Sequence, residues 1–94
     1  MPGRLNHTAV YAAIRALRRG EPAQVDGREF RSFNPAEFGL CAGTRTAVVL
    51  CKIKNRIRIV EAVWKEFGDR PVIAGGGYLS PQKIYGVQTL VAES

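Results

Sequence analysis

Residues 44–68 have the sequence TRTAVVLCKIKNRIRIVEAVWKEFG, and the fold depends on how this stretch is divided. Its run TAVVLCKI, at 46–53, is rich in β-branched residues and predicts a strand. Asn55 suits the N-cap of a helix that ends at Phe67, because Gly68 then occupies the position after the last turn and a proline lies shortly beyond. A strand followed by a helix is therefore the preferred interpretation.

Two other divisions of this stretch stay open. One long helix from Thr46 to Phe67 would keep helical spacing among the apolar residues Val49, Ile53, Ile57, Val60, Trp64 and Phe67. A hairpin that turns near Asn55 would explain why isoleucines alternate with cations, namely Ile53, Ile57 and Ile59 with Lys52, Lys54, Arg56 and Arg58. All three interpretations place a helix at Val60–Phe67.

The flanking segments carry clearer local signals. A helix is expected from His7 to Arg19, with Asn6 as its N-cap and Gly20 after its last turn. The dipeptide Asp26-Gly27 is typical of a type I′ turn and predicts a hairpin. The other expected elements are the hairpin strands Ala23–Val25 and Arg28–Phe33, a loop or short helical turn from Asn34 to Gly43, a strand at Pro71–Ala74, a turn at Gly75–Gly77 and a final strand from about Lys83 to Val91.

These elements predict the α+β class. Ninety-four residues suit one small domain, taken as residues 1–94, and leave too little chain for two cores. The expected element order is α-β-β-β-α-β-β. A mixed β-sheet with two α-helices on one face would bury the apolar stripes of both helices.

The composition is that of a globular protein with a strong basic bias. The net charge of +6 favours polyanionic partners, first nucleic acid and then an acidic protein surface. No apolar run approaches the roughly 20 residues that cross a bilayer, and the first residues lack the apolar core of a signal peptide. We therefore expect a cytoplasmic protein with no membrane role, in which Cys41 and Cys51 stay reduced. The sequence is also compatible with a homo-oligomer.

Positive charge peaks between Arg45 and Arg58, where no acidic residue occurs. In the preferred division, Arg56 and Arg58 fall in the first turn of a helix, where the helix dipole disfavours each cation by about 0.3–1 kcal/mol. A phosphate bound at this helix start would compensate. The predicted binding residues are Lys52, Lys54, Arg56 and Arg58 at the centre, together with Arg45, and Arg15, Arg18 and Arg19 as auxiliary contacts.

The order α-β-β-β-α over the first 67 residues, with its basic second helix start, is similar to that of double-stranded-RNA-binding domains. The resemblance implies that this helix start would lie against phosphates that flank a groove. It is a resemblance of element order, since Asp26-Gly27 makes a tight turn where those domains have a Gly-Pro-Ala-His type of loop. The first 38 residues also resemble a phage head-joining protein of helix–hairpin–helix build.

Residues suited to catalysis or metal binding are scattered. His7, Cys41 and Cys51 lack the spacing of a metal site, and nothing in the sequence brings them together as a catalytic set. The run Gly75–Gly77 matches no phosphate-loop motif and is interpreted as a flexible turn. Four aromatic side chains lie near basic residues and suit either base stacking or core packing: Phe30, Phe33, Tyr78 and Tyr85.

Two functions follow from these observations. The first is a non-enzymatic basic module, without cofactor, that docks on nucleic acid through phosphate contacts. The second is a small inhibitor or adaptor, of the kind encoded by phages and mobile elements, that binds a partner protein on its acidic or nucleic-acid-binding surface. A salt titration of binding tests the first function, and a pull-down after nuclease treatment separates it from the second.

Overall fold

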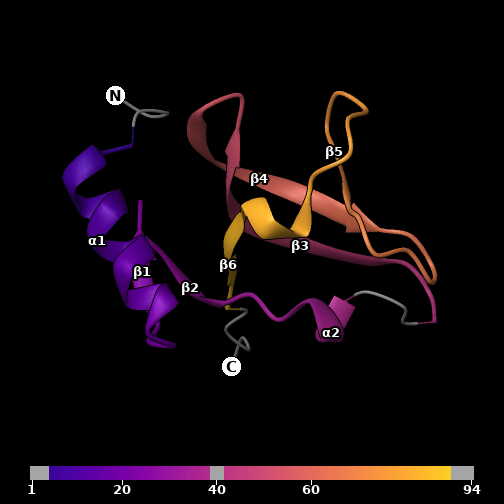
Figure 1. Ribbon diagram of the computed structural model, residues 1–94, viewed down its shortest axis with the longest axis horizontal. Helices are drawn as coiled ribbons and strands as arrows, with labels where there is room; N and C mark the ends of the chain where they lie inside the picture. Colours follow the sequence, from indigo (N-terminus) through magenta and orange to yellow (C-terminus); the bar gives the residue numbers. More distant parts are fainter. Residues whose placement is uncertain (1–4, 39–41, 90–94) are drawn as a thin grey trace.

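A computed structural model describes residues 5–38 and 42–89 of the chain. Its centre is a six-stranded sheet with the spatial order β1-β2-β6-β3-β4-β5, in which every neighbouring pair is antiparallel (Figure 1). The elements are α1 (His7–Arg18), β1 (Ala23–Val25), β2 (Arg28–Ser32), α2 (Pro35–Phe38), β3 (Arg45–Ile53), β4 (Arg56–Trp64), β5 (Val72–Ile73), the 3₁₀ turn η1 (Pro81–Lys83) and β6 (Ile84–Gln88).

The helix α1 forms where the sequence predicts it. The Asn6 side chain accepts a hydrogen bond from the Ala9 N–H at 3.2 Å, which satisfies one of the free donors at the helix start. Gly20, with a φ of 83°, follows the last turn in the left-handed conformation. One side of the helix is buried against the sheet, through Val10, Ala13, Ile14 and Leu17.

The predicted β1–β2 hairpin and its Asp26-Gly27 turn are also confirmed. Asp26 and Gly27 both have positive φ angles, 54° and 74°, as a type I′ turn requires. The register pairs Ala23 with Phe30 and Val25 with Arg28. The short helical turn expected after Asn34 is α2, which has four residues.

The segment from 45 to 64 is a long hairpin, so the preferred strand-and-helix division is wrong. β3 and β4 pair over nine residues each, from Arg45 opposite Trp64 to Ile53 opposite Arg56. Asn55 is a turn residue rather than a helix cap, because Lys54 and Asn55 have φ angles of 49° and 64°. The helix that all three interpretations placed at Val60–Phe67 is absent, since β4 runs to Trp64.

The presence of this hairpin overturns two further expectations. The observed order places the short α2 between β2 and β3 and has no helix between β3 and β5, so the order α-β-β-β-α-β-β is wrong. The resemblance to double-stranded-RNA-binding domains depended on that second helix and loses its basis. The α+β class stands, but the sheet is antiparallel rather than mixed.

The last strand enters the middle of the sheet. β6 pairs with β2 on one side and with β3 on the other, although both precede it by many residues. The 71–74 strand is observed as the two-residue β5, which Gly75 and Gly76 close into a turn with φ angles of 100° and 87°. Of the final strand expected to reach Val91, the part beyond residue 89 lies outside the described residues.

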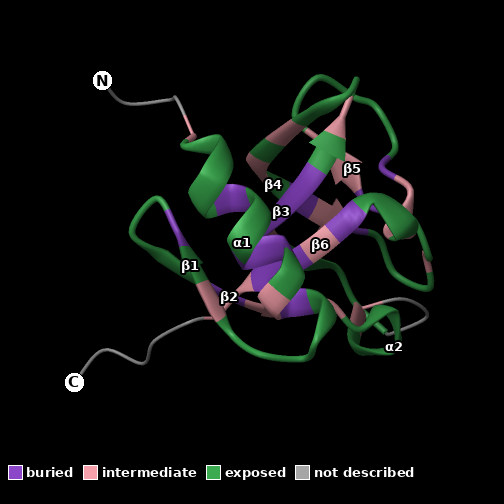
Figure 2. Cartoon of the chain, turned by 60° about the vertical axis from the view of Figure 1, so that its left-hand side comes forward, coloured by how far each residue is buried: buried purple, intermediate pink, exposed green. Residues whose placement is uncertain are grey.

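Apolar side chains fill both faces of the sheet. On one face, α1 packs over Phe30 and Leu50. On the other face, Trp64 lies against Phe38 and Phe33, with ring centroids 4.7 and 5.8 Å away. Figure 2 shows buried residues gathered along β3, β6 and the side of α1 that faces the sheet.

Gly86 is needed because β6 is crowded by its neighbours. A Cβ atom at this position would lie 2.7 Å from the Arg31 carbonyl oxygen and 3.0 Å from Leu17 Cδ1. We therefore expect Gly86→Ala to lower the free energy of unfolding by about 1–3 kcal/mol, the usual cost of overpacking, in urea denaturation. Gly77→Ala is the matched control, since its Cβ meets no atom within 4 Å and its change should stay within about 0.5 kcal/mol. Equal stabilities for the two variants would contradict this role of Gly86.

Candidate functional site

The four cations at the centre of the predicted site lie at the turn end of the β3–β4 hairpin, here called the hairpin tip (residues 52–58). Lys52, Lys54, Arg56 and Arg58 are all exposed. Arg56 and Arg58 pair with Ile53 and Cys51 and share one face of the ribbon, whereas Lys52 pairs with Ile57 on the other face, toward α1. The tip therefore presents positive charge on both of its faces.

The hairpin tip extends beyond its neighbouring strands. β6 pairs with β3 only between Val49 and Cys51, and β5 pairs with β4 only at Ala62 and Val63. Within the described residues, the first half of β4 consequently has strand pairing on one side only. Figure 1 shows the turn between β3 and β4 curling away from the rest of the sheet.

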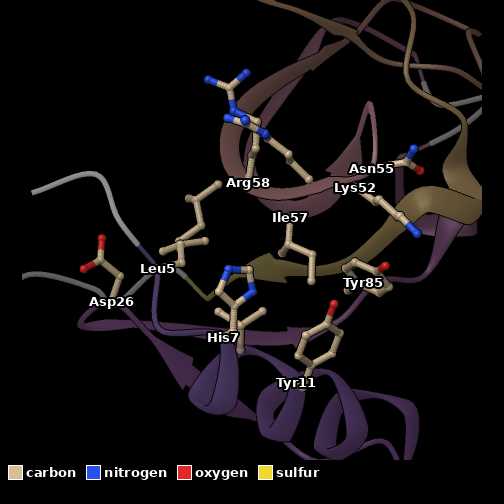
Figure 3. Close-up of a pocket in the computed structure, with 12 residues that line it drawn as sticks. Leu5, His7, Tyr11, Asp26, Lys52, Asn55, Ile57, Arg58 and Tyr85 are labelled. Carbon is tan, nitrogen blue, oxygen red and sulfur yellow. The ribbon is translucent and has the colours of Figure 1, made fainter.

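A groove of about 810 Å³ separates α1 from the hairpin tip; we call it the α1 groove. Figure 3 shows His7 and Tyr11 rising from the helix toward Ile57, with Tyr85 and Lys52 toward one end and Asp26 at the other. The remaining lining residues come from the segment before α1, from α1 and from the β3–β4 hairpin: Leu5, Val10, Asn55, Arg56, Arg58 and Ile59. Segments that are distant in sequence thus form one concave surface.

Aromatic rings dominate the helix side of the α1 groove. The rings of His7 and Tyr11 are 6.3 Å apart at an angle of 25°, so their planes are close to parallel. Tyr11 is 52% exposed, although most of its side chain is apolar. Both residues are exposed, so their rings can contact a ligand in the groove.

Charge within the α1 groove is unevenly distributed. Lys52, Arg56 and Arg58 line it from the tip, and Asp26, in the β1–β2 turn, is the sole acidic residue among the described residues that line it. None of these four side chains takes part in an ion pair given by the structure within the described part of the chain. The tip side is thus suited to an anion, and the Asp26 side to a hydrogen-bond donor.

A second, smaller hollow of about 490 Å³ lies between the tip and the Gly75–Gly77 turn; we call it the tip hollow. Its described lining holds the cations Lys52, Lys54, Arg58 and Lys83 and no acidic residue. Lys52 and Arg58 line both concavities, so the tip forms the ridge between them. Glycines in the turn leave its backbone accessible on this side.

The three auxiliary arginines of α1 and its C-terminal end do not all lie at the α1 groove. Arg18 lies with its guanidinium 5.9 Å from the centre of the Tyr85 ring, which lines the α1 groove. Arg15 follows Tyr11 by four residues and so lies on the same side of α1. Arg19 instead forms an ion pair with Glu21 at 3.1 Å. The structure brings Arg18 and Arg15 to the groove side, whereas Arg19 is engaged elsewhere.

Arg45 is separated from the other predicted residues. It pairs with Trp64 at the far end of the hairpin, about 27 Å along the strand from Ile53 at an ordinary rise per residue. A hydrogen bond from Arg31 lowers the pKa of Glu37 in α2, and the charge of Arg45 lowers it further. Arg45 thus belongs to the α2 end of the molecule.

Cys51 is a core side chain of β3 with no exposed surface. Burial raises the pKa of its thiol from 9.0 to about 11, although the nearby charge of Arg58 acts in the opposite direction. Cys41 lies outside the described residues. Within the described residues, no group of three metal-ligating side chains occurs.

The raised pKa of Cys51 predicts a loss of stability at high pH. The unfolded chain releases the thiol proton near pH 9 and the folded chain near pH 11, so the folded state binds the proton more tightly. Its stabilising contribution is complete below pH 9 and decreases as the pH rises to 11, by about 1.4 kcal/mol per pH unit. Urea denaturation at pH 8, 9 and 10 should show a steeper decline for the parent protein than for Cys51→Ala. An equal decline of stability with pH in the two proteins would contradict this effect of the Cys51 thiol.

No family model matches the chain, and no curated protein or solved structure is significantly similar to it. The described part of the chain also contains no helix with the length and apolar character needed to cross a membrane.

Sequence reasoning found the tip cations but not the α1 groove. His7, Tyr11, Arg15 and Arg18 follow one another at spacings of four, four and three residues, which places them along one side of a helix. That spacing was the available signal for this surface. The contributions of Asp26 and Tyr85 to the groove depend on sheet pairing that no local pattern reveals.

Proposed function

We propose that this protein is a non-enzymatic module that binds nucleic acid by placing the hairpin tip against phosphates. The observation that carries the proposal is the concentration of Lys52, Lys54, Arg56 and Arg58 on a protruding ribbon bordered by two concavities. Lys83 joins these cations from a different element, and the tip itself contains no acidic residue. A phosphate backbone has the charge density that such a surface matches.

The chemistry of the cations supports phosphate as the target. Arg56 and Arg58 each carry a planar guanidinium that can donate two parallel hydrogen bonds to one phosphate. Side chains on both faces of a ribbon can contact successive phosphates of a chain that passes over it. Because these contacts are with the backbone, they imply little discrimination between sequences.

The test of this proposal is a salt titration of binding, measured by fluorescence anisotropy with labelled single-stranded and duplex oligonucleotides. Four phosphate contacts should give a slope of about −3 for log K against log salt on a single strand and about −4 on a duplex. A slope near zero, or no binding at low salt, would contradict it.

A second candidate function, an adaptor or inhibitor that binds a protein, is supported by the open edge of β4. Arg56 to Glu61 lack a second strand neighbour within the described residues, and such an edge can accept a strand from a partner. Affinity capture from a lysate treated with nuclease separates the two functions. Retention of one stoichiometric protein partner would favour the adaptor, and loss of all partners would favour nucleic acid.

A further inference from the structure

We infer that the α1 groove holds an unpaired base, so that the protein takes single-stranded nucleic acid in preference to duplex. This inference rests on the proposed function and adds the kind of nucleic acid to it. Its basis is the juxtaposition of an exposed aromatic surface with the phosphate-binding cations of the hairpin tip.

The aromatic surface is suited to stacking. Tyr11 and His7 of α1 line the groove with their ring planes 25° apart, and the Tyr85 ring of β6, next to the guanidinium of Arg18, also lines it. Every base has a flat face that can stack on such rings, regardless of sequence. In a duplex these faces are stacked on neighbouring pairs and are not available. The groove therefore selects for a strand whose bases are free.

The size of the groove agrees with an occupant of this kind. Its volume of about 810 Å³ lies within the range of roughly 300–1,000 Å³ that small-molecule sites have. The lining includes apolar side chains, Ile57 and Ile59 among them, and Figure 3 shows Lys52 toward one end of the groove and Asp26 at the other. A planar ring with polar edges fits this pattern, whereas a phosphate by itself would leave the aromatic wall without a contact.

The charges orient the ligand in the groove. Asp26 repels a phosphate but accepts hydrogen bonds from the amino and imino groups of a base. Lys52, Arg56 and Arg58 line the groove from the tip and attract the phosphate that precedes or follows that base. Since Lys52 and Arg58 also line the tip hollow, the backbone can continue across the ridge to Lys54 and Lys83. The base thus lies toward α1 and the phosphates over the tip.

The experiment compares three probes of equal length by fluorescence anisotropy: a 12-nucleotide single strand of mixed sequence, its duplex, and an abasic strand with the same phosphates and no bases. We expect the parent protein to bind the intact single strand about tenfold more tightly than either other probe. Tyr11→Ala should weaken binding of the intact strand about tenfold and leave the abasic strand within twofold. His7→Ala should act in the same direction.

The controls distinguish a loss of base stacking from a loss of folding or of positive charge. Phe67→Ala removes another exposed ring, 62% exposed and outside the groove, and should change neither affinity. Tyr11 is half exposed, so its variant should remain folded in thermal unfolding, and the salt slope should be unchanged because no cation is removed.

Two kinds of outcome would overturn the inference. If intact and abasic strands bind equally, or if Tyr11→Ala weakens both to the same extent, the groove does not hold a base, while a steep salt slope would still support the proposed function. If no nucleic acid binds, or if an oligo-glutamate peptide binds as tightly as the intact strand, both the inference and the proposed function fail.

Discussion

Replacing Trp64 by alanine is expected to lower the free energy of unfolding by about 3–5 kcal/mol. Trp64 is 1% exposed at the end of β4, and its ring packs on those of Phe38 and Phe33. This contact holds α2 and the chain after β2 against the sheet. Because small domains have only about 5–15 kcal/mol of total stability, the variant should be partly unfolded well below the melting temperature of the parent protein.

The measurement is urea denaturation followed by circular dichroism. Trp64→Phe is the matched control, since it keeps an aromatic ring in contact with Phe38 and should lose less than half as much stability. A loss below about 1 kcal/mol for Trp64→Ala would mean that Trp64 does not pack as the hairpin requires. Such a small loss of stability would also contradict the position of β4 in the sheet.

The second large effect is expected on binding. The triple variant Lys52→Gln, Arg56→Gln and Arg58→Gln should bind single-stranded nucleic acid about 100-fold more weakly at 0.1 M salt. Three lost phosphate contacts reduce the slope of log K against log salt by about 2, and 0.1 M salt lies one decade below the 1 M reference. All three side chains are exposed, so the free energy of unfolding should change by about 0.5 kcal/mol or less.

A second triple variant provides the control for net charge. Arg45→Gln, Lys65→Gln and Arg70→Gln remove the same number of cations, which takes the formal net charge from +6 to +3 in both variants. These residues lie at the far end of the hairpin, near the Arg45–Trp64 pair and the start of β5. We expect at most a threefold loss of affinity, since only the weak long-range attraction is changed. Comparable losses in the two variants would show that overall charge, and not the tip, governs binding.

Local signals predicted the elements at the start of the chain because their chemistry is local. The Asn6 cap, Gly20 and the Asp26-Gly27 turn each act within a few residues of the structure they specify. The 45–64 hairpin was mistaken for a strand and a helix because both faces of its strands are partly buried. Val49, Leu50 and Cys51 are all buried in succession, which removes the alternation that marks a strand with one exposed face.

The end of that hairpin was also misleading. Gly68 matches a residue that follows a helix, but here it closes a turn in which its N–H donates to the Lys65 carbonyl oxygen at 2.9 Å. Phe67 has a φ of 57°, an uncommon conformation for a bulky residue that no sequence rule favours. The alternation of isoleucines and cations at the tip correctly indicated a hairpin, but this signal was weaker than the apparent helix cap at Asn55.

Four of the predicted site residues lie close together, but not for the reason that the sequence suggested. Lys52, Lys54, Arg56 and Arg58 do lie together, but at a β-turn rather than at a helix start, so the helix dipole has no part in them. The α1 groove could not be predicted because it depends on β6 entering between β2 and β3. Long-range pairing of this kind places Tyr85 beside the helix without any local sequence signal.

The most direct test of the proposal that the hairpin tip is the nucleic-acid interface is the salt slope of single-strand binding for the two triple variants. The slope should be smaller by about 2 for the tip variant than for the parent protein, and unchanged for the far-end variant. Equal slopes for the two variants would contradict the proposal, because phosphates would then not be contacted preferentially by Lys52, Arg56 and Arg58.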